Sequence, residues 1–186
     1  MREITRAILI FVVFSILCGL AYPFAITGLS RLFFAHEAGG SLVTREGSVA
    51  GSALIGQRFE TGRYFRGRPS AVNYDASNSG GTNFGPANRK FLEEVAERVA
   101  KTRGEYGLGP SDQVPSDFVL SSGSGLDPDV SLEAAMVQVG RVAKERKVPE
   151  AALARLVQAS AESSFWGDPA RVNVLRLNLA LDAMGR

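Results

Sequence analysis

The longest apolar segment of the chain runs from Ala7 to Ser30 and contains no charged residue. As a helix it would be about 36 Å long at roughly 1.5 Å of rise per residue, enough to cross a hydrocarbon core of about 30 Å. No segment after Arg31 is comparably apolar. The pattern therefore predicts one transmembrane helix, residues 7–30. The rest of the chain then divides into a tail, a juxtamembrane linker and one domain, residues 1–6, 31–50 and 51–186.

Small residues and a proline mark this predicted span. Ser15 and Gly19 form a small-xxx-small pair, which lets a second helix approach closely. Pro23 lacks an amide proton and crowds the carbonyl of Gly19, so we expect a kink there. Glycine and proline are also common in membrane helices that have no partner. Packing of a partner helix on the Ser15/Gly19 face is therefore a hypothesis.

The charges that flank the span indicate its orientation. Arg2 and Arg6 precede it, against Glu3. Short positive tails stay in the cytoplasm, whereas long domains are translocated largely regardless of their charge. We therefore expect a single-pass protein of the cell (inner) membrane with a cytoplasmic amino terminus and an extracytoplasmic domain. The alternatives are a cleaved signal peptide, whose apolar core is usually shorter and closed by an A-x-A site, and a lipoprotein, which would need a small residue just before Cys18.

Helical periodicity dominates the domain, where apolar residues recur every three or four positions. The helices expected from it are segment 86–103, ended by Gly104, a helix that Ser131 caps, a helix after Pro149, and segment 172–184, which is apolar nearly all round. The short apolar segment 53–59 is a weak strand candidate. The sequence thus predicts an α+β protein with one N-terminal transmembrane helix and a mostly helical extracytoplasmic domain that has a small β component.

Two segments of the domain have the composition of functional loops. Segment 67–88 is dense in glycine, serine, asparagine and proline, and loops of this length are usually functional or disordered. We expect an ordered loop that packs against a partner protein, with Asn78, Ser79 and Asn83 as contacts. The alternative is that its polar side chains meet a small ligand.

The second loop is a Ser/Gly turn before the helix at Ser131. Its members Ser121, Ser122, Gly123 and Ser124 could cradle an anion with free backbone amides. No Gly-Lys-Ser/Thr sequence is present, so this is not a nucleotide P-loop. Segment 121–124 faintly resembles the signature loop of ABC-type ATPases. Together with Gln138, which flanks the apolar stripe of the next helix, it forms a candidate nucleotide contact.

Charge and composition exclude several function classes. The chain has 21 basic and 19 acidic residues, and without the charged residues of the tail the counts are 19 and 18. A nearly neutral domain without a basic stripe does not suit nucleic acid. The only cysteine, Cys18, lies in the span, and the only histidine, His36, lies beside it. Thiol catalysis, a Ser-His-Asp triad and thiolate metal sites are therefore not expected in the domain.

Two further candidate sites, an acidic pair and a Ser/Lys dyad, also need to be considered. Asp127 and Asp129 form a close acidic pair without the further ligands of a calcium loop, and we expect them to cap the helix that follows. A Ser/Lys dyad has many candidate serines and several lysines, and no spacing selects one pair. The residues alone indicate an anchored, noncatalytic accessory domain, with a membrane-tethered extracytoplasmic Ser/Lys hydrolase as the alternative. The lysines in question are Lys90, Lys101, Lys144 and Lys147.

Several longer motifs, in order along the chain, resemble the C subunit of the bacterial Kdp potassium-transporting ATPase. They are Gly51–Gln57, Tyr64-Phe65 with Gly67–Ala71, Ser124–Pro128, Gln138 with Arg141–Ala143, and Val172–Leu175 with Leu177–Asp182. The resemblance covers essentially the whole chain, including the single amino-terminal span. It implies an accessory subunit of a high-affinity, ATP-driven potassium uptake pump, needed for assembly.

The resemblance also implies partners and a role. The partners would be a channel-like potassium-binding subunit, a P-type ATPase subunit, a small single-span subunit and the lipid bilayer. The C subunit is described as a catalytic chaperone that raises the ATP affinity of the ATPase subunit. Because an outward-facing domain cannot reach cytosolic ATP, we expect that effect to be allosteric. The subunit would have no cofactor of its own, and ATP would be contacted only together with the ATPase subunit.

Overall fold

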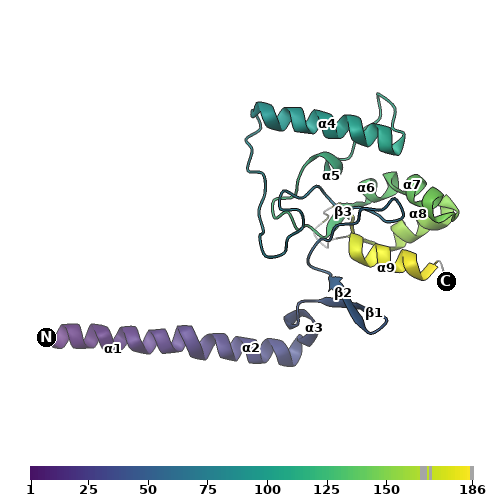
Figure 1. The fold of residues 1–186 in the computed structure, drawn as a ribbon. Coiled ribbons are helices and arrows are strands. Elements are labelled where there is room, and N and C mark those ends of the chain that lie inside the picture. Colours follow the sequence, from purple (N-terminus) through teal and green to yellow (C-terminus); the bar gives the residue numbers. More distant parts are fainter. Residues whose placement is uncertain (164–166, 168, 185–186) are drawn as a thin grey trace. The chain divides into compact units, whose positions relative to one another are not determined.

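The computed structural model describes residues 1–163, 167 and 169–184 (Figure 1). By contacts the chain forms two units, Met1–Leu42 and the segment from Val43 onward. The first is helical. The second contains the sheets, the other helices and the core.

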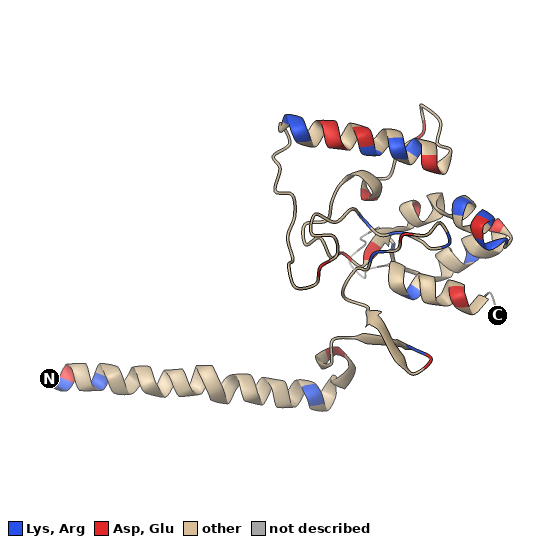
Figure 2. Cartoon of the chain, viewed as in Figure 1, with Lys and Arg blue, Asp and Glu red and all other residues tan. Residues whose placement is uncertain are grey.

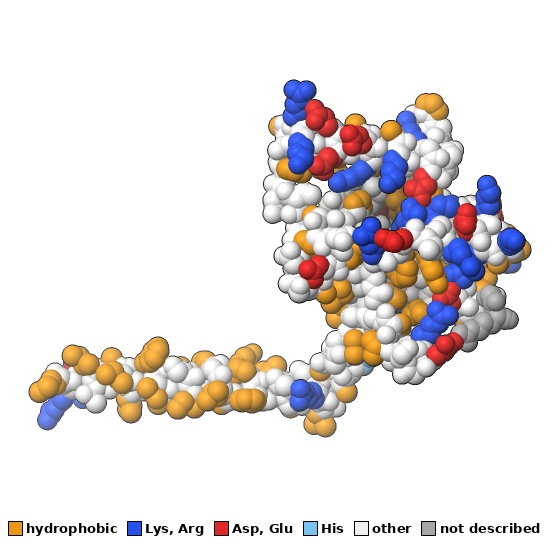
Figure 3. Space-filling view, viewed as in Figure 1, with side chains coloured by type: hydrophobic (Ala, Val, Ile, Leu, Met, Phe, Trp, Pro, Cys, Tyr) orange, Lys and Arg blue, Asp and Glu red, His pale blue; other side chains and the backbone are white. Residues whose placement is uncertain are grey.

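The first unit is a continuous apolar helix built from α1 (Arg2–Ile16), a π-helical turn (Leu17–Ala21) and α2 (Tyr22–Phe33), followed by the short α3 (Ala35–Ala38). Residues 2–33 form the one helix of the described residues that is long and apolar enough to cross a membrane, and its most apolar 18-residue stretch has a mean hydropathy of 2.4. Its charged residues lie only near its two ends, and apolar side chains cover the length between them (Figures 2 and 3). The helix thus extends beyond the predicted residues 7–30 at both ends.

The π-helical turn explains how the helix accommodates its proline. Pro23 cannot donate to the carbonyl four residues earlier, so the regular ladder is interrupted there. The amide of Tyr22 instead bonds to the carbonyl of Leu17, five residues back. The expected irregularity is therefore a local π-helical turn within a continuous helix (Figure 1).

A β-hairpin occupies the second half of the predicted linker. Strands β1 (Leu42–Arg45) and β2 (Ser48–Ser52) pair in a two-stranded sheet. The two turn residues Glu46 and Gly47 both have positive φ, as a tight hairpin turn requires. The strand predicted at 53–59 is wrong, because β2 ends at Ser52 and irregular chain follows. In that segment the Gly56 amide bonds to the Leu126 carbonyl of a loop, 2.8 Å away.

A three-stranded antiparallel sheet lies at the centre of the second unit, in the order β3 (Asp129–Ser131), β5 (Arg171–Asn173) and β4 (Ala161–Glu162). Val172 of β5 is in register with Val130 on one side and Ala161 on the other. Two strands continue directly into helices. As predicted, Ser131 caps the first of these, accepting the Ala134 amide at 3.1 Å.

Four helices build the core with this sheet: α6 (Leu132–Val137) and α9 (Val174–Met184) contact its strands, and α7 (Val139–Arg146) and α8 (Glu150–Ala159) pack against the other helices. Two predictions need correction here. The last helix begins at Val174 rather than 172, because its first two expected residues pair in β5. The acidic pair caps no helix, since Asp129 lies in β3 and Asp127 accepts the Asp129 amide at 3.1 Å.

The core gathers small and branched apolar side chains from the sheet and these helices. Phe65, from an irregular segment, lies among them with none of its surface exposed. The fully buried members are Phe65, Ala134, Ala135, Val142, Leu153, Val157, Val172 and Leu177. Burial of such side chains stabilises a fold by roughly 1.5–3 kcal/mol for each Val, Leu or Phe. The α+β architecture predicted from the sequence is confirmed.

Helix α4 (Arg89–Tyr106) lies beside α5 (Ser116–Val119), away from this core, and Thr102 is its one buried residue. Its boundaries differ from those predicted. Asn88 caps it by accepting the Phe91 amide at 3.2 Å, and it continues through Gly104 to Gly107, which adopts the left-handed conformation. On its surface Glu94 and Arg98, four residues apart, form an ion pair at 3.1 Å.

Asp182, near the end of α9, joins three distant parts of the second unit. Its carboxylate accepts hydrogen bonds from Arg45 of β1, from Arg146 of α7 at 2.6 Å and from the Tyr64 hydroxyl at 3.2 Å. Burial alone would raise the pKa of Asp182. The hydrogen bond and charge of Arg146, with the bonds from Arg45 and Tyr64, outweigh that effect and lower the pKa.

Candidate functional site

Two buried amide side chains hold an irregular segment, residues 65–66, against the core. Asn178 accepts the Phe65 amide and donates to the Phe65 carbonyl, both at 2.9 Å. Gln138 does the same for Arg66, at 2.8 and 3.0 Å. The two side chains thus take the place of a neighbouring strand. They position the chain from which the pocket described below is built.

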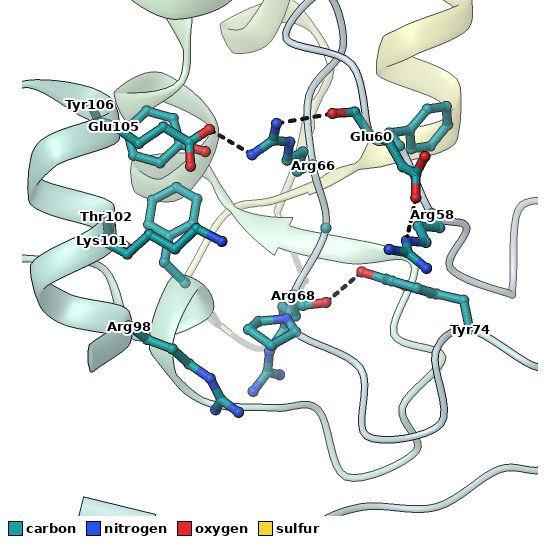
Figure 4. Close-up of a pocket in the computed structure, with 14 residues that line it drawn as sticks. Arg58, Glu60, Arg66, Arg68, Tyr74, Arg98, Lys101, Thr102, Glu105 and Tyr106 are labelled. Atoms are coloured by element: carbon teal, nitrogen blue, oxygen red, sulfur yellow. Dashed lines mark hydrogen bonds and ion pairs between the residues drawn. The ribbon is translucent and has the colours of Figure 1, made fainter. Parts of the chain in front are cut away.

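A pocket of about 480 Å³ lies between this segment, the residues before it, and the C-terminal half of α4 (Figure 4). Cationic and aromatic side chains make up most of its wall. The lining residues are Arg58, Phe59, Glu60, Arg66, Gly67, Arg68, Pro69, Tyr74, Arg98, Lys101, Thr102, Glu105, Tyr106 and Phe118. Figure 3 shows charged side chains of both signs on and beneath α4.

Two arginines of the pocket are fixed by carboxylates that lie far away in the sequence. Arg66 donates to Glu105 of α4 at 2.5 Å. Arg68 donates to Asp127 at 3.0 Å, and its Nε lies 3.6 Å from Asp117. Charge-assisted pairs of this kind restrict the geometry of the guanidinium groups. Both guanidinium groups are therefore held in place by contacts within the protein, before any ligand binds.

The other three cations differ in how far they are neutralised. Arg98 binds Glu94 at 3.1 Å, and Arg58 binds Glu60 at 3.0 Å. Lys101 has no ion pair or hydrogen bond to any residue that the structure describes, and it is exposed. In Figure 4 it extends from α4 toward the middle of the pocket, while Arg58 and Glu60 approach from the opposite side.

Aromatic rings provide apolar surface between these charges. Tyr106 stacks on Phe118 with 4.9 Å between ring centroids, and the Arg141 guanidinium lies 5.5 Å from the Tyr106 ring. Burial raises the pKa of Tyr106, although the Arg141 charge partly opposes the shift. Burial also raises the pKa of Tyr74, whose hydroxyl donates to the Arg68 carbonyl. Both tyrosines are therefore neutral phenols at neutral pH.

The two loops expected from composition lie against each other. Ser79 donates to the Ser124 carbonyl at 3.1 Å, and the Gly80 amide bonds to the same oxygen at 2.8 Å. The Ser122 amide bonds to the Pro69 carbonyl, and Ser122 is buried. Part of the predicted anion cradle is therefore occupied by the chain itself.

The other residues predicted as contacts in these loops form none of the hydrogen bonds just described. Ser121 is half-buried, whereas Gly123 is exposed. Asn78 and Asn83 are exposed on loop 67–88, where a partner could reach them, and Asn83 has a positive φ.

Gln138 does not lie with that loop. It is fully buried, and besides its two bonds to Arg66 it accepts one from Arg141 at 3.0 Å. None of its hydrogen bonds in the described part of the chain reaches segment 121–124. These contacts give Gln138 a structural role, and its part in nucleotide contact stays a prediction.

In the first unit, the proposed helix-packing face is open. Ser15 and Gly19 are both exposed, and a Cβ added at Gly19 would meet nothing within 4 Å. Among the described residues, no group of three or more His, Cys, Asp or Glu side chains could hold a metal ion.

Comparison with known proteins gives a whole-length match. Residues 4–183 match the family model described as KdpC, the K⁺-transporting ATPase c chain. The chain belongs to the KdpC family. It is 45% identical to the potassium-transporting ATPase KdpC subunit of Rhodopseudomonas palustris (strain BisB5), over 100% of this chain and 99% of that protein.

Relatives from other bacteria match equally well. The KdpC subunit of Caldanaerobacter subterraneus is 47% identical, over 97% of this chain and 94% of its own length. That of Mycobacterium tuberculosis (strain ATCC 25177 / H37Ra) is 45% identical, over 98% of this chain and 99% of its own. The family resemblance inferred from the sequence motifs is confirmed.

The sequence reasoning missed the pocket. Its arginines do stand out as the run Arg63 to Arg68, where basic residues alternate with Tyr64 and Phe65, and α4 carries Arg98, Lys101 and Glu105 at helical spacing. No local signal showed that the two segments face each other.

Proposed function

We propose that the chain is the noncatalytic accessory subunit of an ATP-driven, high-affinity potassium uptake pump. It would be needed for assembly and stability and would act as a catalytic chaperone that raises the ATP affinity of the P-type ATPase subunit. The observation that carries this proposal is the match of residues 4–183 to the c chain of K⁺-transporting ATPases. The partners are a channel-like potassium-binding subunit, the P-type ATPase subunit and a small single-span subunit.

The membrane arrangement rests on the amino-terminal helix. Residues 2–33 are long and apolar enough to span the bilayer, and Arg2 and Arg6 precede the uncharged part. The proposed orientation follows, with the amino terminus in the cytoplasm and the domain outside it. The span packs beside the channel-like subunit through Ser15 and Gly19. The domain covers the potassium entrance, with loop 67–88 as a contact.

The effect on ATP affinity is proposed to be allosteric. Contacts of this subunit favour the pump conformation that binds ATP better. The gain in ATP affinity is set by how much more strongly the subunit binds that conformation than the other one. Three contacts support this view over direct ATP binding: Ser122 and Ser124 are both bonded to loop 67–88, and Gln138 is bonded to Arg66, just before that loop. ATP is therefore contacted only together with the ATPase subunit.

The hydrolase alternative has no supporting contact in the described residues. None of Lys90, Lys101, Lys144 and Lys147 forms a hydrogen bond with a serine there, and no serine lines the pocket with Lys101. That alternative predicts activity of the purified protein, which would be lost when one serine and one lysine are replaced.

The test is affinity purification of the tagged full-length protein in mild detergent from potassium-starved cells. Copurification of a P-type ATPase and a channel-like subunit, with potassium-stimulated ATP hydrolysis, is the expected result. Recovery of the intact protein alone would overturn the proposal. The allosteric part fails separately if the isolated protein binds ATP at micromolar affinity and its domain proves to be cytoplasmic.

A further inference from the structure

The pocket beside α4 is built to hold negative charge without being a phosphate site. Two of its cations, Arg66 and Arg68, are fixed by internal carboxylates, so they set the shape of the wall. Lys101 and Arg58 lie on opposite sides of the pocket and are both exposed (Figure 4). Lys101 has no counterion among the described residues. Arg58 pairs with Glu60 at 3.0 Å and donates to Asn73 at 2.8 Å, but Arg58 and Glu60 are both exposed, so this pair can exchange for another carboxylate. Lys101 and Arg58 are therefore the two cations that an incoming anion can reach most readily.

Several features of the wall disfavour a polyphosphate. Glu60 and Glu105 line the pocket together with the cations, and they would face a ligand of several negative charges. Helix α4 contributes its C-terminal half, Arg98 to Tyr106, and the C-terminal end of a helix carries partial negative charge. Gly67 is the one glycine of the wall, so no glycine-rich run of amides faces the cavity.

The aromatic part of the wall suits a polypeptide, and single carboxylates spaced along a chain bring less negative charge near Glu60 and Glu105 than a polyphosphate does. Phe59, Tyr74 and the stacked pair Tyr106–Phe118 offer ring surface, which is typical of the centre of protein interfaces. A volume of about 480 Å³ accommodates a few side chains of a short segment. Aspartate or glutamate side chains of an extended segment that point to the same side lie about 7 Å apart. Two carboxylates of such a segment can therefore face the pocket together.

We propose that this pocket docks an acidic segment from an extracytoplasmic loop of another subunit of the pump. Carboxylates of that segment bind Lys101 and Arg58, and an aromatic or aliphatic side chain between them rests on the Tyr106–Phe118 pair. The inference rests on the proposed function, because it takes the partner from the same pump. It adds where the partner binds and what chemistry the partner presents.

The first test maps the contact in the assembled complex. The photoreactive residue p-benzoylphenylalanine replaces Lys101 in the full-length protein, and in a control it replaces Lys144, which is exposed on α7 and does not line the pocket. After irradiation of membranes, mass spectrometry identifies the linked peptides. The expected result is a link from position 101, and not from 144, to an Asp- or Glu-containing segment of another pump subunit. Links from position 101 to lipid alone, or links that ATP abolishes, would overturn the docking proposal.

The second test is charge reversal. The double variant Arg58→Glu with Lys101→Glu should reduce the recovery of partner subunits at least about fivefold, since both exposed attractions become repulsions. Lys144→Glu should leave recovery unchanged. If the wild-type protein recovers its partners and the double variant recovers them equally, the docking proposal is wrong while the pump assignment stands. If the wild-type protein recovers no partner, both are wrong.

Discussion

Replacing Gln138 by methionine separates a structural role of its amide from a role in ligand binding. The Gln138→Met side chain is similar in length and unbranched, so it fills the same space without a large cavity. It removes three hydrogen bonds, two to the Arg66 backbone and one from Arg141. At about 0.5–1.5 kcal/mol of net stability for each bond, the expected loss in unfolding free energy is about 3 kcal/mol.

The loss is measured by melting the full-length protein in detergent micelles while following the near-ultraviolet circular dichroism of its tyrosines. One kcal/mol shifts the midpoint by about 2–4 °C for a protein of this size, so a drop of about 6–12 °C is expected. The matched control is Gln158→Met, because Gln158 is exposed on α8 and forms no hydrogen bond through its side chain with the described residues. Its midpoint should stay within about 2 °C of the wild type.

A midpoint for Gln138→Met that equals the control would refute the reasoning. It would mean that the 65–66 segment does not depend on the Gln138 amide. If, in addition, ATP raised the midpoint of the wild type and not that of Gln138→Met, the amide would instead be a ligand contact. A large loss of stability that is the same with and without ATP supports the structural role.

Three further substitutions test other parts of the structure. Burial is the main cause that raises the pKa of Asp129, and the neighbouring charge of Asp127 adds to it. The ionised carboxylate therefore destabilises the folded protein at pH values above that pKa, whereas the protonated form below it has little effect. Asp129→Asn should therefore raise the melting midpoint at about pH 7 and change it little near pH 4, and an unchanged midpoint at both would contradict the argument. Gly125 has a φ of 68°, and a Cβ there would lie 2.6 Å from a valine methyl group, so Gly125→Ala should cost about 1–3 kcal/mol in urea unfolding. Gly123→Ala, in open space, should cost less than about 0.5 kcal/mol, and equal losses would argue against the contact between the two loops. Gly19→Leu should lower copurification of partner subunits about fivefold, the equivalent of roughly 1 kcal/mol of helix packing, whereas Gly28→Leu, about half a turn away around the helix, should not.

The sequence predicted what depends on local pattern. A long uncharged apolar run predicts a helix long and apolar enough to span a membrane without help from the rest of the chain, and the structure has that helix. Ser131 before an apolar stripe likewise marked a helix start, because capping needs only the next few residues. The residues at which helices and strands begin and end were predicted less well. Val172 continues the apolar pattern of α9, yet Val172 and Asn173 pair with β3, whose residues lie about forty positions earlier in the chain.

The pocket could not be predicted because its geometry depends on remote partners. The guanidinium of Arg68 is fixed by Asp127, and that of Arg66 by Glu105. Arginine-rich segments usually indicate a solvated surface, and nothing local indicates where their counterions lie. The burial of Gln138 was hidden for the same reason, since the backbone that it binds lies 72 residues earlier.

The bonds of Asp182 and Asn178 also set an order of events during synthesis. They join α9 to Arg45 and Phe65, 137 and 113 residues earlier in the chain. These two contacts of the early segments therefore form only once the last helix has been made. Until then the Phe65 amide and carbonyl lack their Asn178 partner, although Gln138 can already bind Arg66 beside them. A chain that stopped before Val174 would lack these bonds and the core side chains Leu177 and Leu181, so the packing of the second unit depends on the last helix to be made.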